Sequence, residues 1–249
     1  MSFNQPVLKA ESKYGDLLYA VANDHCAWRV KSMYTKEKDT IAWIDSMQPG
    51  ETFIDIGANM GIYTIYAAKR GLKVIAFEPE AQNYALLCRS IMINELDVQA
   101  YCVALSDEWK ADSLYLSGFL PGGSCHTFGV DLDHRLTMRE RPVGPLKQGC
   151  LALPLDKFEI KADHCKVDVD GLEHKVVAGA PKTIAGLKSI LLEINRNLPE
   201  HKRLVTLMES LGFGYDPEQA ESARRKEGTF KDCGNFIWHR NAEQVLSAA

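Results

Sequence analysis

Residues 53 to 64 combine a short apolar segment with a glycine-containing turn, Phe-Ile-Asp-Ile-Gly-Ala-Asn-Met-Gly-Ile-Tyr-Thr. An acid, Glu78, ends the next apolar run, about 20 residues later. This spacing is typical of α/β sheets that bind a nucleoside cofactor, because the backbone approaches the ligand at the turn and the carboxylate accepts the ribose hydroxyls. The pattern therefore predicts a nucleoside site between Gly57 and Glu78.

The residues of the turn indicate which nucleoside would bind. A dinucleotide fingerprint needs glycine at positions 57, 59 and 62, since the diphosphate must contact bare backbone. Asn59 and Ile62 occupy two of these positions, and Asp55 adds negative charge beside them. We therefore expect a phosphate-free cofactor with a zwitterionic end, S-adenosylmethionine. A nicotinamide-dependent oxidoreductase and a non-catalytic cofactor-binding protein of the same fold are the alternatives.

A second acidic group lies in the segment Lys166-Val167-Asp168-Val169-Asp170-Gly171-Leu172-Glu173. Asp168 should lie at the carboxyl edge of a strand, on the same rim as Gly57. It is therefore a candidate to face the reacting methyl group or a metal ion. Asp170 and Glu173 have the spacing of a capping box, and we interpret them as a helix cap.

Glu193 lies inside a later apolar strand segment. An unpaired carboxylate there would cost on the order of several kcal/mol, so Glu193 should reach the rim or pair with a cation such as Arg196 or Lys166. Together, Asp168 and Glu193 could supply oxygen ligands to Mg²⁺ or orient an acceptor hydroxyl. His174 is a third catalytic candidate, as a general base.

An alternation of strands and helices is required to bring these residues to one edge. Apolar runs predict the strands, and apolar residues at helical spacing predict the helices. The predicted strands are 51–56, 73–78, 98–104, 164–169, 188–194 and a closing antiparallel strand at 235–239; the predicted helices are 36–47, 61–70, 81–94, 172–179 and 200–211. This order predicts an α/β fold with a doubly wound sheet.

The chain also suggests a division into parts. Residues 1–49 should form an N-terminal cap, with one or two strands in 14–33 and a helix, ahead of a catalytic domain over 50–249. The segment 118–149 is rich in glycine and proline. We predict that it is a loop insertion, which could be a lid over the cofactor, a surface insertion or a contact in a homo-oligomer.

Composition sets broad limits on function. With 249 residues, 46% of them hydrophobic, and a net charge of -4, the chain should be globular and have no overall attraction for nucleic acid or anionic lipid. There is no run of roughly 18 apolar residues and no apolar signal core near the start. The seven cysteines lack any C-x-x-C spacing, so we expect reduced thiols and a cytoplasmic protein.

With both acidic motifs in view, the chain resembles the FkbM family of S-adenosylmethionine-dependent methyltransferases. The matching segments are 53–61, 77–79, 103–107, 155–156, 166–173 and 192–195, in the order of the family. One departure is Asp170, where the family usually has glutamate.

The resemblance implies a seven-stranded Rossmann-like methyltransferase sheet with six parallel strands and a last antiparallel one. It also implies positions for the cofactor: Asp55, Gly57 and Asn59 at the methionine end, Ala58 and Gly61 in the same turn, Glu78 on the ribose, and Ala104, Ser106 and Asp107 beside adenine. Because family members mostly methylate oxygen, the expected acceptor is a hydroxyl of a sugar, glycan or small metabolite.

Overall fold

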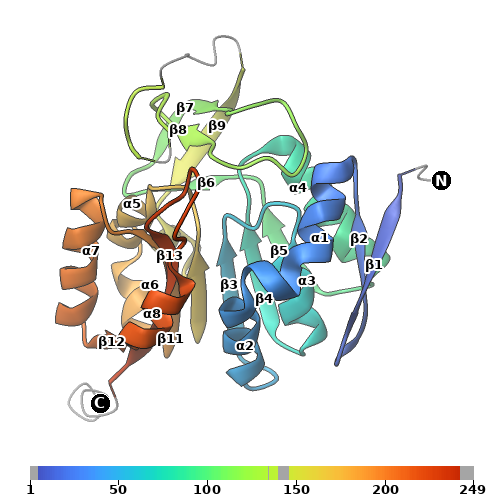
Figure 1. The fold of residues 1–249 in the computed structure, drawn as a ribbon, viewed down its shortest axis with the longest axis horizontal. Helices are drawn as coiled ribbons and strands as arrows, with labels where there is room; N and C mark the ends of the chain where they lie inside the picture. The colour runs from blue at the N-terminus through green and yellow to red at the C-terminus, as the bar shows by residue number, and fades with distance from the viewer. Residues whose placement is uncertain (1–4, 134, 140–145, 242–249) are drawn as a thin grey trace.

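A computed structural model describes residues 5–133, 135–139 and 146–241. Its centre is a seven-stranded sheet with helices on both faces (Figure 1). In order across the sheet, the strands are β12 (Phe213–Tyr215), β13 (Cys233–Arg240), β11 (Ser189–Asn195), β10 (His164–Val167), β3 (Thr52–Ile56), β4 (Lys73–Phe77) and β5 (Val98–Tyr101).

Strand directions follow the predicted arrangement. The strands β5, β4, β3, β10 and β11 pair in parallel, whereas β13 pairs antiparallel with both β11 and β12. Six strands therefore run one way, and the last strand in the sequence runs the other. The doubly wound, seven-stranded sheet is confirmed, as is the closing antiparallel strand.

The helices divide between the two faces because side chains alternate along each strand. On β3, Phe53 belongs to one apolar core, and Ile54 and Ile56 belong to the other. The first face is covered by α1 (Asp24–Lys36), α2 (Lys38–Ser46), α3 (Ile62–Lys69) and α4 (Ala81–Ile93); the second is covered by η1 (Leu155–Phe158), α5 (Glu173–Ala178), α6 (Pro181–Gly186) and α7 (Pro199–Ser210). The short helix α8 (Pro217–Ala223) packs on β13. In the part of the chain that the structure describes, no helix has the length and apolar character needed to cross a membrane.

The N-terminal segment differs in part from the prediction. It begins with a hairpin of β1 (Val7–Ser12) and β2 (Gly15–Ala20), so a strand does lie within residues 14–33. From Asp24 onward, however, the chain is the helix α1, and the expectation of strands there was wrong. The buried side chains Cys26, Val30 and Met33 have helical spacing, and Asn23 caps the helix by accepting the N–H of Cys26.

A second, four-stranded sheet covers the carboxyl edge of the first (Figure 1). Its order is β6 (Ala104–Leu105), β9 (Lys147–Leu153), β7 (Lys110–Tyr115) and β8 (Thr127–Phe128). The predicted strand 98–104 is therefore broken after Tyr101, because Ala104 and Leu105 pair with β9 instead of extending β5. The predicted loop 118–149 contains β8 and the start of β9; its residues 134 and 140–145 lie outside the described part of the chain.

The chain reverses direction across the sheet at β3. It passes from β3 to β4 and β5 on one side, and later returns to β10 on the other side of β3. Ligands of open α/β sheets bind at the carboxyl ends of the strands at such a reversal. Gly57 lies there with φ +76°, and a Cβ added to it would be 1.9 Å from the carbonyl oxygen of Asp168.

We predict that Gly57→Ala destabilises the protein by at least about 2 kcal/mol, because the added methyl group overlaps backbone at a φ that L-residues disfavour. Gly118→Ala is the matched control, since its Cβ would meet nothing within 4 Å. Urea unfolding of both variants measures the difference. Equal free energies of unfolding for the two variants would contradict the prediction.

Candidate active site

A cavity of about 570 Å³ lies at the carboxyl ends of the central strands. Four predicted residues from four different strands or their ends line it: Gly57 after β3, Glu78 after β4, Asp168 after β10 and Glu193 in β11. The facing wall comes from α1 and from two loops, one containing Ser124 and the other Phe230. This volume is in the usual range for small-molecule and cofactor sites.

The turn after β3 is held close to β4. The N–H groups of Gly57 and Ala58 both donate to the carbonyl of Phe77, at 2.9 and 3.1 Å. Asn59 has φ 52° and Gly61 has φ 91°, so the turn is compact before α3 begins. Gly57, Ala58 and Asn59 line the cavity, whereas Gly61 does not; it lies against the side chain of Leu87.

Glu78 is tied directly to this turn. Its Oε2 accepts the N–H of Asn59 at 2.7 Å, and its Oε1 accepts the N–H of Glu80 at 2.9 Å. The side chain is only 5% exposed. Burial raises the pKa of Glu78 to about 7, against the opposing effect of the two N–H donors. The predicted pair of glycine turn and acid is therefore one connected unit.

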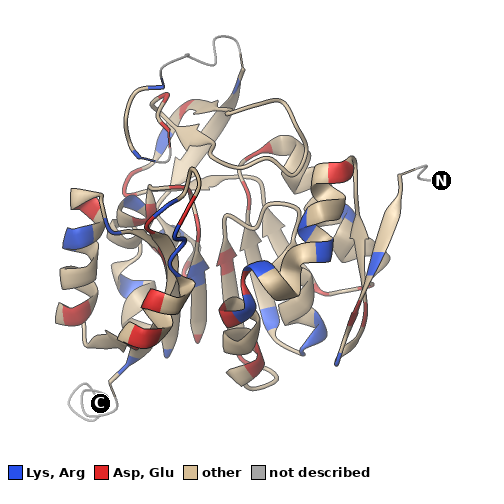
Figure 2. Ribbon diagram, viewed as in Figure 1, with Lys and Arg blue, Asp and Glu red and all other residues tan. Residues whose placement is uncertain are grey.

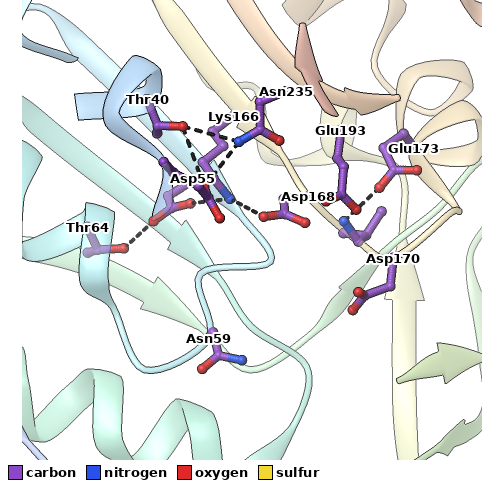
Figure 3. Close-up of polar contacts among 12 residues, drawn as sticks. Thr40, Asp55, Asn59, Thr64, Lys166, Asp168, Asp170, Glu173, Glu193 and Asn235 are labelled. Atoms are coloured by element: carbon purple, nitrogen blue, oxygen red, sulfur yellow. Dashed lines mark hydrogen bonds and ion pairs between the residues drawn. The ribbon is translucent and has the colours of Figure 1, made fainter. Parts of the chain in front are cut away.

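A buried lysine of β10, Lys166, lies between Asp55 of β3 and Asp168, which follows β10 (Figure 3). Lys166 Nζ lies 3.0 Å from Asp168 Oδ2 and 3.9 Å from Asp55 Oδ1, and Thr64 Oγ1 donates to Asp55 Oδ2 at 2.6 Å. Burial alone would lower the pKa of Lys166, but the carboxylates of Asp168 and Asp55 raise it above its usual value. Lys166 and Asp168 line the cavity, whereas Asp55, which is 1% exposed, supports Lys166 from behind.

Glu193 also has a cationic partner. Arg225 Nη1 donates to Glu193 Oε1 at 2.9 Å. Glu193 is therefore paired with Arg225, and not with Arg196 or Lys166, the two partners that the sequence suggested. Arg196 instead pairs with Glu221. Burial, and then the nearby charge of Asp168, raise the pKa of Glu193 well above its usual value although Arg225 opposes them.

Part of the predicted 118–149 loop lies on the cavity. The carbonyl of Gly123 accepts the side-chain amides of Asn59, at 2.6 Å, and Asn83, at 3.0 Å. The N–H of Cys125 donates to Asp170 Oδ2 at 2.6 Å. Asp170 is therefore not the N-cap of α5, and the capping-box prediction was wrong for this residue. Burial raises the pKa of Asp170 to about 6.

Several predicted residues do not reach the cavity. Ala104 pairs with β9, and the N–H of Ser106 donates to Leu153, so this segment belongs to the second sheet. Asp107 lies 4.0 Å from Lys175 on the surface. His174 is on α5, with its ring 6.3 Å from that of His201, and it does not line the cavity. The predicted role of His174 as a base therefore has no support from its position.

The sequence reasoning missed most of the facing wall. One stripe of α1 lines the cavity with His25, Trp28, Arg29, Ser32 and Lys36. The rings of His25 and Trp28 stack with centroids 5.6 Å apart, and Lys36 lies 5.8 Å from the centroid of Trp28. The spacing of these residues is helical. A helix predicted over residues 24–36 would have placed these side chains on one face.

The predicted magnesium site is not supported by the arrangement of side chains. Within the described residues, no group of three or more His, Cys, Asp or Glu side chains is placed to hold a metal ion. Asp168 and Glu193 are instead each paired with a cationic side chain. Their carboxylate oxygens therefore form ion pairs with Lys166 and Arg225, as buried carboxylates in proteins generally do with cationic side chains.

Comparison with solved structures identifies the fold. Magnesium protoporphyrin IX methyltransferase from Synechocystis PCC 6803 with bound SAM has a TM-score of 0.50 and 11% identity, with 89% of this chain and 86% of that chain covered. Ribosomal protein L11 methylase from Lactobacillus delbrueckii subsp. bulgaricus has a TM-score of 0.48 and 12% identity, with coverage of 83% and 79%.

A third similar structure is a 16S rRNA N2 G1207 methyltransferase from T. Thermophilus, with a TM-score of 0.44 and 13% identity. The alignment covers 95% of this chain but 50% of that one, so the chain spans half the length of that enzyme. At such identities the likeness concerns the fold alone. No curated protein matches the chain at a significant level.

The family comparison is more specific. The methyltransferase FkbM domain matches residues 55–215, which include the turn after β3, Glu78, Asp168 and Glu193. This is more than half of the chain, and it confirms the family that the motifs suggested. The protein belongs to the FkbM methyltransferase family.

Proposed function

We propose that the protein transfers the methyl group of S-adenosylmethionine to a hydroxyl oxygen of a sugar, glycan or small metabolite. The observation that carries the proposal is the hydrogen bond between Asn59 and Glu78, which joins the glycine turn and the acid at one cavity. In this proposal Glu78 accepts the ribose hydroxyls, and the turn at Gly57 and Ala58 contacts the rest of the nucleoside.

The lining of the turn disfavours a dinucleotide. Asn59 and Ile62 line the cavity at positions where a diphosphate would need bare backbone, and Asp168 lines the same cavity. A diphosphate would meet both side-chain bulk and like charge there. A cofactor without phosphate groups meets neither obstacle.

Methyl transfer requires alignment of the acceptor and removal of a proton. When bound, S-adenosylmethionine supplies an electrophilic methyl group on a sulfonium. The chain must hold the acceptor oxygen in line with that group and exclude water, and such orientation accelerates reactions strongly. Glu193 is the proton acceptor in this proposal, because its raised pKa makes it the stronger base, while Arg225 favours its ionised form.

Asp168 suits a different task from Glu193. Burial would raise the pKa of Asp168, but the ammonium of Lys166, 3.0 Å away, lowers it below the usual value. A carboxylate with a low pKa is a weak proton acceptor and a persistent negative charge. We therefore assign Asp168 to binding and orientation.

The acceptor would meet the wall that lies outside the family match. The stripe on α1 and the loop containing Arg225 and Phe230 both lie beyond residues 55–215. The aromatic ring of Trp28 and polar side chains such as Arg29 and Ser32 suit a small hydroxylated molecule. Basic and acidic residues are interspersed over the fold (Figure 2), and both kinds line the cavity, which gives little net field to attract a polyanion.

We expect S-adenosylhomocysteine to raise the melting temperature of the protein and NAD to leave it unchanged, because only the former lacks the diphosphate. A thermal-shift series over a range of concentrations of each compound measures this, since a ligand that binds the folded state raises its stability by mass action. The reverse result would favour the oxidoreductase alternative.

The affinity for S-adenosylhomocysteine should fall as the pH drops from 8 to 6. Burial holds the pKa of Glu78 at about 7, so at lower pH the carboxyl group is protonated and loses acceptor capacity for the ribose hydroxyls. Calorimetry at pH 6, 7 and 8 measures the change. Glu78→Gln should bind more weakly and flatten the profile; an unaltered slope in this variant would assign the effect to another group, such as Asp170.

Glu193→Gln should lower the turnover number about 100-fold without altering the affinity for S-adenosylhomocysteine, because the amide keeps an oxygen for Arg225 but cannot accept the proton. The assay follows S-adenosylhomocysteine release with the best acceptor from a panel of sugars and hydroxylated metabolites. Glu221→Gln, which alters an exposed acid–arginine pair, is the control. Wild-type turnover in the Glu193 variant would exclude this role.

A further inference from the structure

The cavity is lined by an ion pair between Lys166 and Asp168, which the sequence motifs did not predict. Lys166 and Asp55 are direct partners in the parallel pairing of β10 with β3, so their side chains share one face of the sheet. Asp168 follows at the end of β10, with its carbonyl against Gly57. The ammonium of Lys166 therefore lies between two carboxylates at the turn after β3 (Figure 3).

Both members of the pair retain capacity for further hydrogen bonds. The ammonium of Lys166 has three donors. Lys166 donates one hydrogen bond to Asp168 Oδ2, at 3.0 Å. Its contact with Asp55 Oδ1, at 3.9 Å, is an ion pair that is too long for a hydrogen bond. Asp168 is bonded to Lys166 through Oδ2, and its side chain remains 26% exposed while it lines the cavity.

The position of Lys166 is unusual for a lysine. Its side chain is 2% exposed, and the ring of Tyr63 lies 5.4 Å from Nζ. Lysine is almost never fully buried unless it is paired, and a buried ion pair is weak evidence for stability because desolvation offsets its attraction. A pair that opens onto a cavity can exchange partners with a ligand of matching charges, and the charges then stay compensated.

We propose that the Lys166–Asp168 pair binds the zwitterionic amino-acid end of the cofactor, with Asp168 receiving the ammonium and Lys166 the carboxylate. This inference rests on the proposed function. In it, Asp55 holds Lys166 from behind and does not contact the ligand, and Thr64 holds Asp55. The pair thereby distinguishes nucleosides with an amino-acid tail from those without one.

Binding of two related ligands distinguishes a binding role of the Lys166–Asp168 pair from a purely structural role. S-adenosylhomocysteine carries the amino-acid tail, whereas 5′-methylthioadenosine shares the adenosine and the sulfur but lacks the tail. Calorimetry with both ligands is performed on the full-length wild type, Lys166→Met and Asp168→Asn. Each variant should lose about 10-fold or more in affinity for S-adenosylhomocysteine and change less than about twofold for 5′-methylthioadenosine, as expected for lost charge-assisted hydrogen bonds.

Lys175→Met is the matched control, because it removes a lysine from an exposed lysine–aspartate pair outside the cavity. Wild-type affinity of Lys166→Met or Asp168→Asn for S-adenosylhomocysteine would overturn the proposal, and so would an equal loss for both ligands. Asp168→Asn keeps the size of the side chain, so it decides the matter if Lys166→Met fails to fold. A wild type that binds neither ligand would overturn the proposed function itself.

Discussion

The close approach of β3 and β10 at their carboxyl ends is the constraint on which the site depends. Gly57 leaves no room for a side chain, since a Cβ there would lie 1.9 Å from the carbonyl oxygen of Asp168. The N–H groups of the same turn donate to Phe77 and so join it to the end of β4. The turn, Glu78 and Asp168 are therefore fixed relative to one another by backbone contacts, which suits a site that must hold a ligand without rearranging.

The site also contains buried charged side chains, and the three described next each have a defined partner. Glu78 accepts two backbone N–H groups, Lys166 pairs with Asp168, and Glu193 pairs with Arg225. Burying these groups unpaired would be strongly unfavourable. These groups lie around one cavity, so under the proposed function they are placed to recognise a charged ligand.

The two ends of the chain complete the cavity around the family domain. The α1 stripe comes from the N-terminal segment, and Arg225 comes from the loop before β13, while the matched residues 55–215 supply the turn and the strand ends. Under the proposed function, the cofactor half and the acceptor half of the site thus have separate origins in the sequence. Changes at the chain ends could alter the acceptor without disturbing the cofactor turn.

The sequence by itself determined the βαβ order, the turn at Gly57 with its acid Glu78, and the positions of Asp168 after one strand and Glu193 within another. These features are encoded locally, because apolar periodicity and glycine spacing act within a few residues of the chain. Only the tertiary structure decided that Arg225 neutralises Glu193, that α1 faces the turn, and that Ala104 belongs to a second sheet. Such pairings join residues far apart in sequence, and they follow from how the layers pack, which no local pattern records.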